Sequence, residues 1–175
     1  MNIQLKLLVE QDVNAYKNLR LKSFQEAPFA FSESYEDEVK KLESEFLEEL
    51  KILNNPPECY TLGAFSENNE LIGFVKFRRD LRSKARHKSM IYALYVDEKH
   101  RKQGIAKKLL LEVLQKAQKL SGLEQIHLWV LHADNSVSDF YKKCGFESQG
   151  TRVKNDLKIN GIYVDAEYMV KYLND

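Results

Sequence analysis

The chain reads Leu94-Tyr95-Val96-Asp97-Glu98-Lys99-His100-Arg101-Lys102-Gln103-Gly104-Ile105-Ala106 at the point that decides its fold. A run of aliphatic and tyrosine residues, typical of a strand, ends at Val96, and a long amphipathic helix begins after Gly104. The first N–H groups of a helix have no partner within it and carry the positive end of the helix dipole. The join therefore predicts a binding site for a diphosphate, where Gly104 permits close approach and Arg101 and Lys102 add charge. The alternative is a helix start in which glycine serves only tight packing.

A second motif lies downstream and reads Phe140-Tyr141-Lys142-Lys143-Cys144-Gly145-Phe146. It predicts the end of a short helix, with Gly145 in the left-handed position after the last turn and Phe146 starting the next strand. Taken alone, Tyr141 is also compatible with a buried aromatic residue whose hydroxyl is satisfied. We expect Cys144 to pack in the core, because no base or charge that would activate a nucleophile is visible beside it.

Together the two motifs resemble those of the GNAT superfamily, the GCN5-related N-acetyltransferases. In that superfamily Arg/Gln-x-x-Gly-x-Gly/Ala forms the acyl-CoA loop, and Phe/Leu-Tyr-x-x-x-Gly-Phe follows it. The resemblance implies that acetyl-CoA is the acyl donor and that the Tyr141 hydroxyl points at its sulfur as a proton donor. The residues expected to bind it are Leu94, Tyr95, Val96, Arg101, Lys102, Gln103, Gly104, Ile105, Ala106, Asn135 and Tyr141.

Two positions depart from the family pattern. Family members often carry an asparagine seven residues before the tyrosine, where Asp134 stands here, and Asn135 is six residues before it. We favour Asn135 as the contact to pantetheine, because an amide both donates and accepts hydrogen bonds. Some members carry a glutamate base on the strand before the loop, but Met90 occupies that position. A water chain is therefore the expected base, with Glu33, Asp165 and Glu167 as further carboxylates to consider.

The resemblance implies direct attack of an amine on the thioester. The oxyanion would be stabilised by backbone N–H groups at Leu94 to Val96, and Tyr141 would protonate the leaving thiolate. We expect an N-acetyltransferase acting on a primary amine, more readily that of a small molecule than of a protein. The alternatives are a protein amine as acceptor, a non-catalytic acyl-CoA-binding sensor, and a nucleic-acid-binding module that uses the basic residues between 78 and 88. The oligomeric state stays open, a homodimer included.

Composition narrows the class of protein. The 175 residues suffice for one domain, expected over residues 1–175, and 27 basic against 26 acidic residues give a net charge of +1 without a drive toward nucleic acid or membrane. Cys59 and Cys144 form no CxxC pair, and the four histidines lack ligand spacing, so we expect no metal. The basic stretch 78–88 could meet the 3′-phosphate of CoA, but a solvated hairpin loop is favoured. No apolar run could span a bilayer and no signal peptide is visible, so we expect a soluble, cytoplasmic protein with no membrane partner.

Periodicity and chain breakers predict an α/β (α+β) fold with the order β-α-α-β-β-β-α-β-α-β-β. The expected strands cover 2–8, 60–65, 71–77, 90–96 and 125–131, and two closing strands flank the turn Asn160-Gly161, the second spanning 162–173. The expected helices follow Asp12, follow Ser32 or Ser34 with Val39, Leu42, Phe46, Leu50 and Leu53 at helical spacing, and cover 105–120 and 136–144. The resemblance implies a mixed central sheet, flanked by helices, in which the strand ending at Val96 splays from the strand at 125–131.

Overall fold

The structure is a computed structural model that describes residues 2–52, 54–132, 135–150 and 152–173. Its strands are β1 (Gln4–Leu7), β2 (Cys59–Phe65), β3 (Leu71–Arg79), β4 (Lys88–Val96), β5 (Gln125–His132), β6 (Glu147–Ser148), β7 (Val153–Ile159) and β8 (Ile162–Tyr172). Its α-helices are α1 (Val13–Glu26), α2 (Tyr35–Glu38), α3 (Glu43–Ile52), α4 (Ile105–Gln118) and α5 (Ser136–Lys143).

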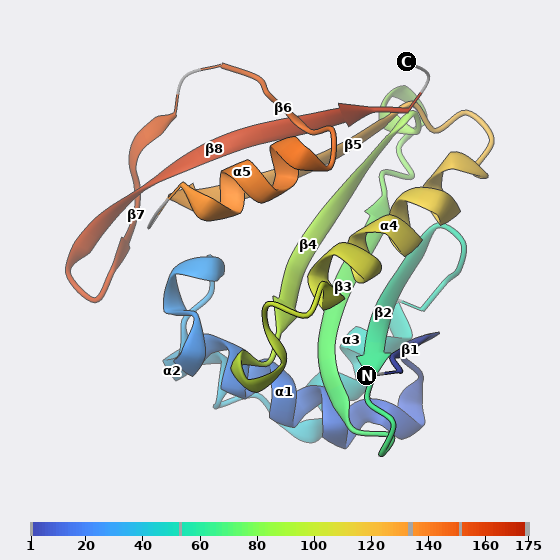
Figure 1. The fold of residues 1–175 in the computed structure, drawn as a ribbon, viewed down its shortest axis with the longest axis vertical. Coiled ribbons are helices and arrows are strands. Elements are labelled where there is room, and N and C mark those ends of the chain that lie inside the picture. Colours follow the sequence, from blue (N-terminus) through green and yellow to red (C-terminus); the bar gives the residue numbers. More distant parts are fainter. Residues whose placement is uncertain (1, 53, 133–134, 151, 174–175) are drawn as a thin grey trace.

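One sheet organises the described residues, in the order β1-β2-β3-β4-β5-β8-β6, with β7 pairing with β8 (Figure 1). All neighbouring strands are antiparallel except β4 and β5, which run parallel. The predicted mixed sheet is therefore confirmed. The long connection that a parallel pair requires is α4, which crosses from the end of β4 to the start of β5.

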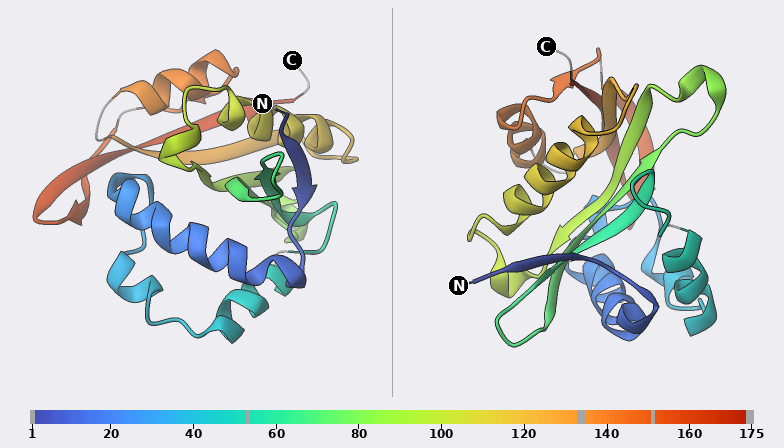
Figure 2. Two further views of the ribbon diagram at one scale, coloured as in Figure 1. Left: turned by 60° about the horizontal axis from the view of Figure 1, so that its bottom comes forward. Right: turned by 90° about the vertical axis from the view of Figure 1, so that its right-hand side faces the viewer.

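Helices cover both faces of the sheet and enclose two apolar clusters. On one face, α4 and α5 pack on the central strands through residues such as Leu109, Val113 and Tyr141 (Figure 1). On the other, α1 and α3 pack on β3 and β4 through Tyr16 and Phe46 (Figure 2). Because successive side chains of a strand point to opposite faces, the central strands contribute to both clusters. Their near-continuous burial follows from this arrangement.

The acidic helix predicted after Ser32 or Ser34 is two helices. The Ser34 hydroxyl accepts the N–H of Asp37 and caps α2, which ends at Glu38. A new helix starts after Leu42, whose N–H donates to the Glu45 carboxylate at 2.7 Å. The cost of the break is small because Val39 and Leu42 are exposed rather than buried on a continuous stripe. Leu53 lies outside the described residues.

The chain between α5 and the closing hairpin holds one more strand than predicted. The short β6 pairs with Val170 and Met169 of β8, and β7 pairs with the N-terminal part of the same strand. The Asn160-Gly161 turn joins β7 to β8 as predicted, with both residues at positive φ. The first and last residues of β8, Ile162 and Tyr172, are exposed, so the two ends of this strand do not belong to the core.

Candidate active site

The two central parallel strands separate along their length. β4 and β5 pair only over Lys88–Met90 and Gln125–His127, and beyond Met90 they diverge (Figure 1). A β-bulge marks the divergence, because Phe74 pairs with Tyr95 and Lys76 pairs with Tyr92, which leaves Ala93 and Leu94 opposite a single residue. Ala93 has a φ of 51°, an uncommon value for a residue with a side chain. The predicted splay of β4 from β5 is thus present, and the strained backbone of Ala93 lies where the two strands begin to separate.

The orientation of the β4 backbone identifies the amides that face this opening. The Asp97 N–H donates to the Ile72 carbonyl, toward β3. Because successive N–H groups of a regular strand point to opposite edges, the N–H group of Val96 points away from β3, and Leu94, within the bulge, has no partner in the β3 register. The amide of Tyr95 belongs to the β3 pairing, and its side chain is buried against Phe74. Of the three predicted backbone donors, the geometry favours Leu94 and Val96.

The loop before α4 has the backbone shape that the sequence predicts. Gly104 adopts a φ of 77°, and a Cβ built there would meet nothing within 4 Å. Lys102 is also left-handed, with a φ of 61°, and Lys102 and Gln103 are exposed. The Lys108 N–H is the first to bond within the helix, to the Gly104 carbonyl at 3.0 Å, which leaves the amides of Ile105 and Ala106 without helical partners. Ile105 anchors this first turn in the core.

Arg101, predicted to add charge beside the loop, also makes contacts within the protein. Its Nε donates to the Val96 carbonyl at 2.9 Å, and its Nη2 lies 3.6 Å from a Glu26 carboxylate oxygen. Glu26 also accepts the Glu98 N–H at 3.0 Å and the Tyr95 hydroxyl. Because these contacts join the end of α1 to the loop, Arg101 serves first to hold the loop against β4. Sequence reasoning missed Glu26, whose partners lie about 70 residues away.

Tyr141 lies on α5 in the apolar cluster under α4 and α5. Gly145 has a φ of 85°, and the Phe146 N–H bonds to the Tyr141 carbonyl at 3.1 Å, as in the Schellman motif predicted for this helix end. Phe146 packs edge-on against the tyrosine ring. Burial raises the pKa of the Tyr141 hydroxyl well above 10, so it holds its proton at physiological pH.

The predicted pantetheine contact is described only in part. Asn135 immediately precedes α5 and is exposed, and its Oδ1 accepts a hydrogen bond from Arg152 at 2.8 Å. That bond engages the amide oxygen and leaves the amide nitrogen as a donor. Asp134, the alternative, lies outside the described residues.

A cavity of about 540 Å³ opens on the side of β4 away from α4. We call it the bulge cavity, since Ala93 is part of its wall; the other walls come from α1, the segment 30–33, β3, β5, β7 and β8. Met90 and Tyr92 line it from β4. Glu33 lies at its side and is the carboxylate, of the three considered from sequence, that lines this cavity.

The other two carboxylates are committed elsewhere. Asp165 accepts the Asn155 N–H at 3.0 Å. Glu167 is buried and accepts hydrogen bonds from His132 at 2.6 Å and from the α5 residue Ser138 at 2.8 Å. Glu167 therefore fixes the first turn of α5 rather than facing an acceptor.

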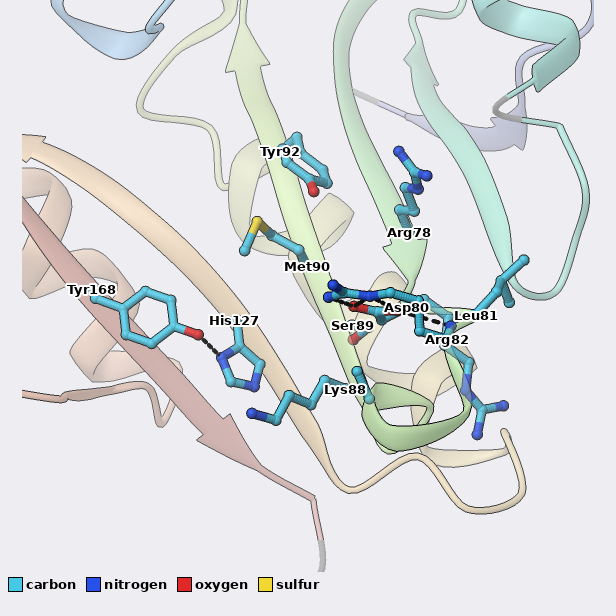
Figure 3. A pocket seen from close by; sticks show the side chains of 12 residues that line it. Arg78, Asp80, Leu81, Arg82, Lys88, Ser89, Met90, Tyr92, His127 and Tyr168 are labelled. Atoms are coloured by element: carbon cyan, nitrogen blue, oxygen red, sulfur yellow. Dashed lines mark hydrogen bonds and ion pairs between the residues drawn. The ribbon is translucent and has the colours of Figure 1, made fainter.

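A second cavity, of about 550 Å³, adjoins the β3–β4 hairpin, and we call it the hairpin cavity (Figure 3). It shares Arg78, Met90 and Tyr92 with the bulge cavity. Tyr168 donates to His127 Nδ1 on its far side, while His127 Nε2 lies 3.0 Å from the Gln125 amide oxygen. Burial lowers the pKa of His127, so the ring is neutral at pH 7.

The basic hairpin is largely exposed, as the solvated loop favoured from sequence requires, and its Arg78, Arg82 and Lys88 also line this cavity. It also lies at the opposite end of β4 from the Gly104 loop, which does not support a contact with the 3′-phosphate of CoA.

The cysteines fit a packing role. Cys59 and Cys144 are free, and burial raises the pKa of each thiol. A raised pKa lowers the thiolate fraction and so weakens a nucleophile. Among the described residues, no group of three or more His, Cys, Asp or Glu could hold a metal ion. In the same part of the chain, no helix has the length and apolar character needed to cross a membrane.

A strand that splays beyond a bulge, a glycine loop opening α4 and a tyrosine on α5 define the architecture of an acyl-CoA-dependent acetyltransferase. Residues 18–146 match the acetyltransferase (GNAT) family, and the chain belongs to that family. The family predicted from the two motifs is therefore confirmed.

Similar proteins agree with this assignment. The chain is 34% identical over 80 residues to the L-amino acid N-acetyltransferase AaaT of Escherichia coli, a match that covers 46% of this chain and 49% of that protein. The match thus spans about half the length of this curated relative.

Solved structures show the same fold over nearly the whole chain. A GNAT-family acetyltransferase from Streptococcus pneumoniae superposes with a TM-score of 0.87 at 22% identity, covering 98% of this chain and 99% of that one. A phosphinothricin acetyltransferase from Sinorhizobium meliloti, solved with acetyl-CoA, gives 0.85 at 22% identity, covering 99% and 89%. At such identities these likenesses confirm the predicted α/β fold.

Proposed function

We propose that the protein is an acetyl-CoA-dependent N-acetyltransferase that moves an acetyl group directly to the primary amine of a small molecule. One observation carries the proposal: the bulge at Ala93 and Leu94 borders both the opening between β4 and β5 and the bulge cavity. An acyl donor on the α4 and α5 side and an amine on the other side would meet at this bulge. A cavity of about 540 Å³ is within the usual range for small-molecule sites. The amino acid acetyltransferase named above also supports a small acceptor.

The proposed donor site uses the residues predicted from sequence. The diphosphate would lie on the α4 N-terminus, against Gly104 and the amides of Ile105 and Ala106, with Lys102 and Gln103 beside it. Arg101 would hold the loop and add its charge. Asn135 would donate to pantetheine from the start of α5, and Leu94 and Val96 would offer their amides. Tyr95 contributes packing.

In the proposed reaction the neutral amine attacks the thioester carbonyl carbon. The resulting oxyanion accepts hydrogen bonds from the amides of Leu94 and Val96. The amine proton leaves through water near Glu33, the C–S bond breaks, and Tyr141 supplies the proton that the departing thiolate takes up. Because burial raises its pKa, Tyr141 must donate in concert with this bond breaking and regain its proton from solvent.

Two measurements test the proposal. Free CoA should raise the melting temperature, since a ligand that binds only the native state stabilises it. Wild-type enzyme should then release free thiol from acetyl-CoA only when an amine is present. CoA binding without turnover of any amine in a broad panel would favour the acyl-CoA sensor instead. A homodimer and the absence of nucleic-acid and membrane partners stay predictions.

A further inference from the structure

The charged residues of the bulge cavity are not all balanced. Arg20 is buried and ion-paired, with its Nε 3.1 Å from Glu38 and its Nη2 3.7 Å from Glu33. Lys76 is paired with Glu49. Arg78 is exposed, and its side chain forms no ion pair or hydrogen bond with another described residue. One cation in the cavity wall is therefore free to bind a ligand.

The surroundings of Arg78 add positive potential. In the adjoining hairpin cavity the lining cations include Arg82 and Lys88, while the lining carboxylate is that of Asp80 (Figure 3). Arg82 donates side-chain hydrogen bonds to Asp80 and holds the pKa of that carboxyl at about 2, so this charge is ionised and already occupied. Figure 3 shows Arg78 on β3, next to the strand β4 that carries Tyr92, and both residues line the two cavities. Asp80 is near enough to feel the charge of Arg78, but no carboxylate among the described residues forms an ion pair with that guanidinium.

The facing wall offers the opposite charge. Asp156 of β7 lines the bulge cavity, is exposed, and makes no ion pair with another described residue. Glu33 lies at the same cavity. A molecule carrying both an ammonium and an anionic group would thus find a complementary charge at each wall.

We infer that the acceptor amine carries an anionic group, a carboxylate or a phosphate, which Arg78 binds through its guanidinium. Arginine suits such a group because its planar fork donates two parallel hydrogen bonds. The inference rests on the proposed function, and it assigns Arg78 as the residue that selects the acceptor. Asp156 and Glu33 draw the amine end toward the bulge, where it loses its proton before attack.

The test compares matched acceptors. Leucine is paired with leucinamide, γ-aminobutyrate with butylamine, and O-phosphoethanolamine with ethanolamine, so that carboxylate and phosphate are tested separately. In the leucine pair basicity favours the neutral member, because an α-amino group beside an amide has a pKa near 8 and is more often neutral at pH 7, so a preference for leucine cannot come from basicity. We expect kcat/KM for the anionic member of at least one pair to exceed that of its neutral member by about tenfold or more.

Variants locate the effect. Arg78→Gln should lower kcat/KM for the preferred anionic acceptor roughly ten- to a hundredfold and leave its neutral partner nearly unchanged. Arg78→Lys should restore part of the loss. The matched control is Lys84→Gln, which removes a cation from the same hairpin outside both cavities and should change neither acceptor.

A binding measurement keeps the inference separate from the proposed function. With CoA present, calorimetry should show that N-acetylleucine, or another N-acetylated anionic acceptor, binds more tightly than its neutral counterpart. Arg78→Gln should abolish this difference in affinity. Preference for neutral amines or polyamines, or equal loss for both members of each pair in Arg78→Gln, would overturn the inference while leaving the transferase proposal intact. If wild-type protein turned over none of the amines, anionic or neutral, the proposed function itself would be overturned.

Discussion

The two sides of β4 differ in the groups that they present to a ligand. On the α4 and α5 side, the proposed donor site consists mainly of backbone amides and one tyrosine, drawn from two short motifs. On the α1 side, the bulge cavity has walls of side chains from α1, β3, β4, β5, β7 and β8. A backbone site needs a particular local conformation, which glycine positions reveal in sequence, whereas a side-chain site depends on how distant segments meet. The donor site should therefore be common to the family and the acceptor cavity particular to this chain.

The largest expected effect is at Gly104, on the donor side. Gly104→Glu places bulk and negative charge where the diphosphate would lie, and a residue with a side chain is strained at a φ of 77°. We expect the rise in melting temperature with CoA to disappear. Gly161→Glu is the matched control, since Gly161 has a φ of 82° in open space on the β7–β8 turn. Calorimetry showing that Gly104→Glu binds CoA like wild type would remove the loop from the donor site.

The next effect concerns Tyr141, the donor-side residue proposed to supply a proton. Tyr141→Phe keeps the ring that packs on Phe146 and removes only the hydroxyl. General acid catalysis contributes about 10²–10⁴-fold, and water can partly replace it, so kcat should fall roughly ten- to a thousandfold. A donor acting only in the transition state lowers kcat and kcat/KM together, with CoA affinity nearly unchanged. An unaltered kcat would reduce Tyr141 to a packing residue. Tyr163→Phe, at an exposed position on β8, is the control.

The fold was predicted in more detail than the acceptor side. The sequence predicts the strand and helix order, the Gly104 loop and the Gly145 helix end, because each depends on neighbouring residues. It predicts one acidic helix where α2 and α3 form, because helical spacing alone does not reveal that the Leu42 N–H donates to the Glu45 carboxylate and starts a new helix. It could not place Arg78 at the same cavity as Asp156 or join Glu26 to Arg101, because nothing local links these residues. It also could not choose among Glu33, Asp165 and Glu167 as carboxylates near the acceptor, because only their contacts in the folded protein distinguish them.

Glu167 tests how firmly the donor-side helix is held. Burial by itself would raise the pKa of this carboxyl, but hydrogen bonds from Ser148, Ser138 and His132 outweigh burial and lower the pKa to about 2. The folded-state value is below the unfolded value of 4.5, so the stabilisation is complete above pH 4.5 and is lost as the pH falls toward 2. Its upper bound is about 3 kcal/mol.

We therefore expect Glu167→Gln to lower the free energy of unfolding most at neutral pH and least near pH 2, as followed by urea titration across that range. The matched control is Asp165→Asn on the same strand. A loss from Glu167→Gln that is equal at pH 7 and pH 2 would refute the assigned cause.

The smallest effect is expected at the cysteines. Transfer without an acyl-enzyme predicts that Cys59→Ala with Cys144→Ala keeps most activity, because burial keeps both thiols protonated. Intact mass spectrometry with acetyl-CoA alone should show no stable acetyl-cysteine. Loss of turnover in a folded, CoA-binding Cys144→Ala protein would place a covalent step on the donor side.

The most direct test of the two-sided site is thiol release from acetyl-CoA, measured with and without each amine of the matched panel. The account predicts release that depends on the amine in wild type and is absent in Gly104→Glu at the same acetyl-CoA concentration. Wild-type protein that binds CoA yet releases thiol with none of the amines would contradict it.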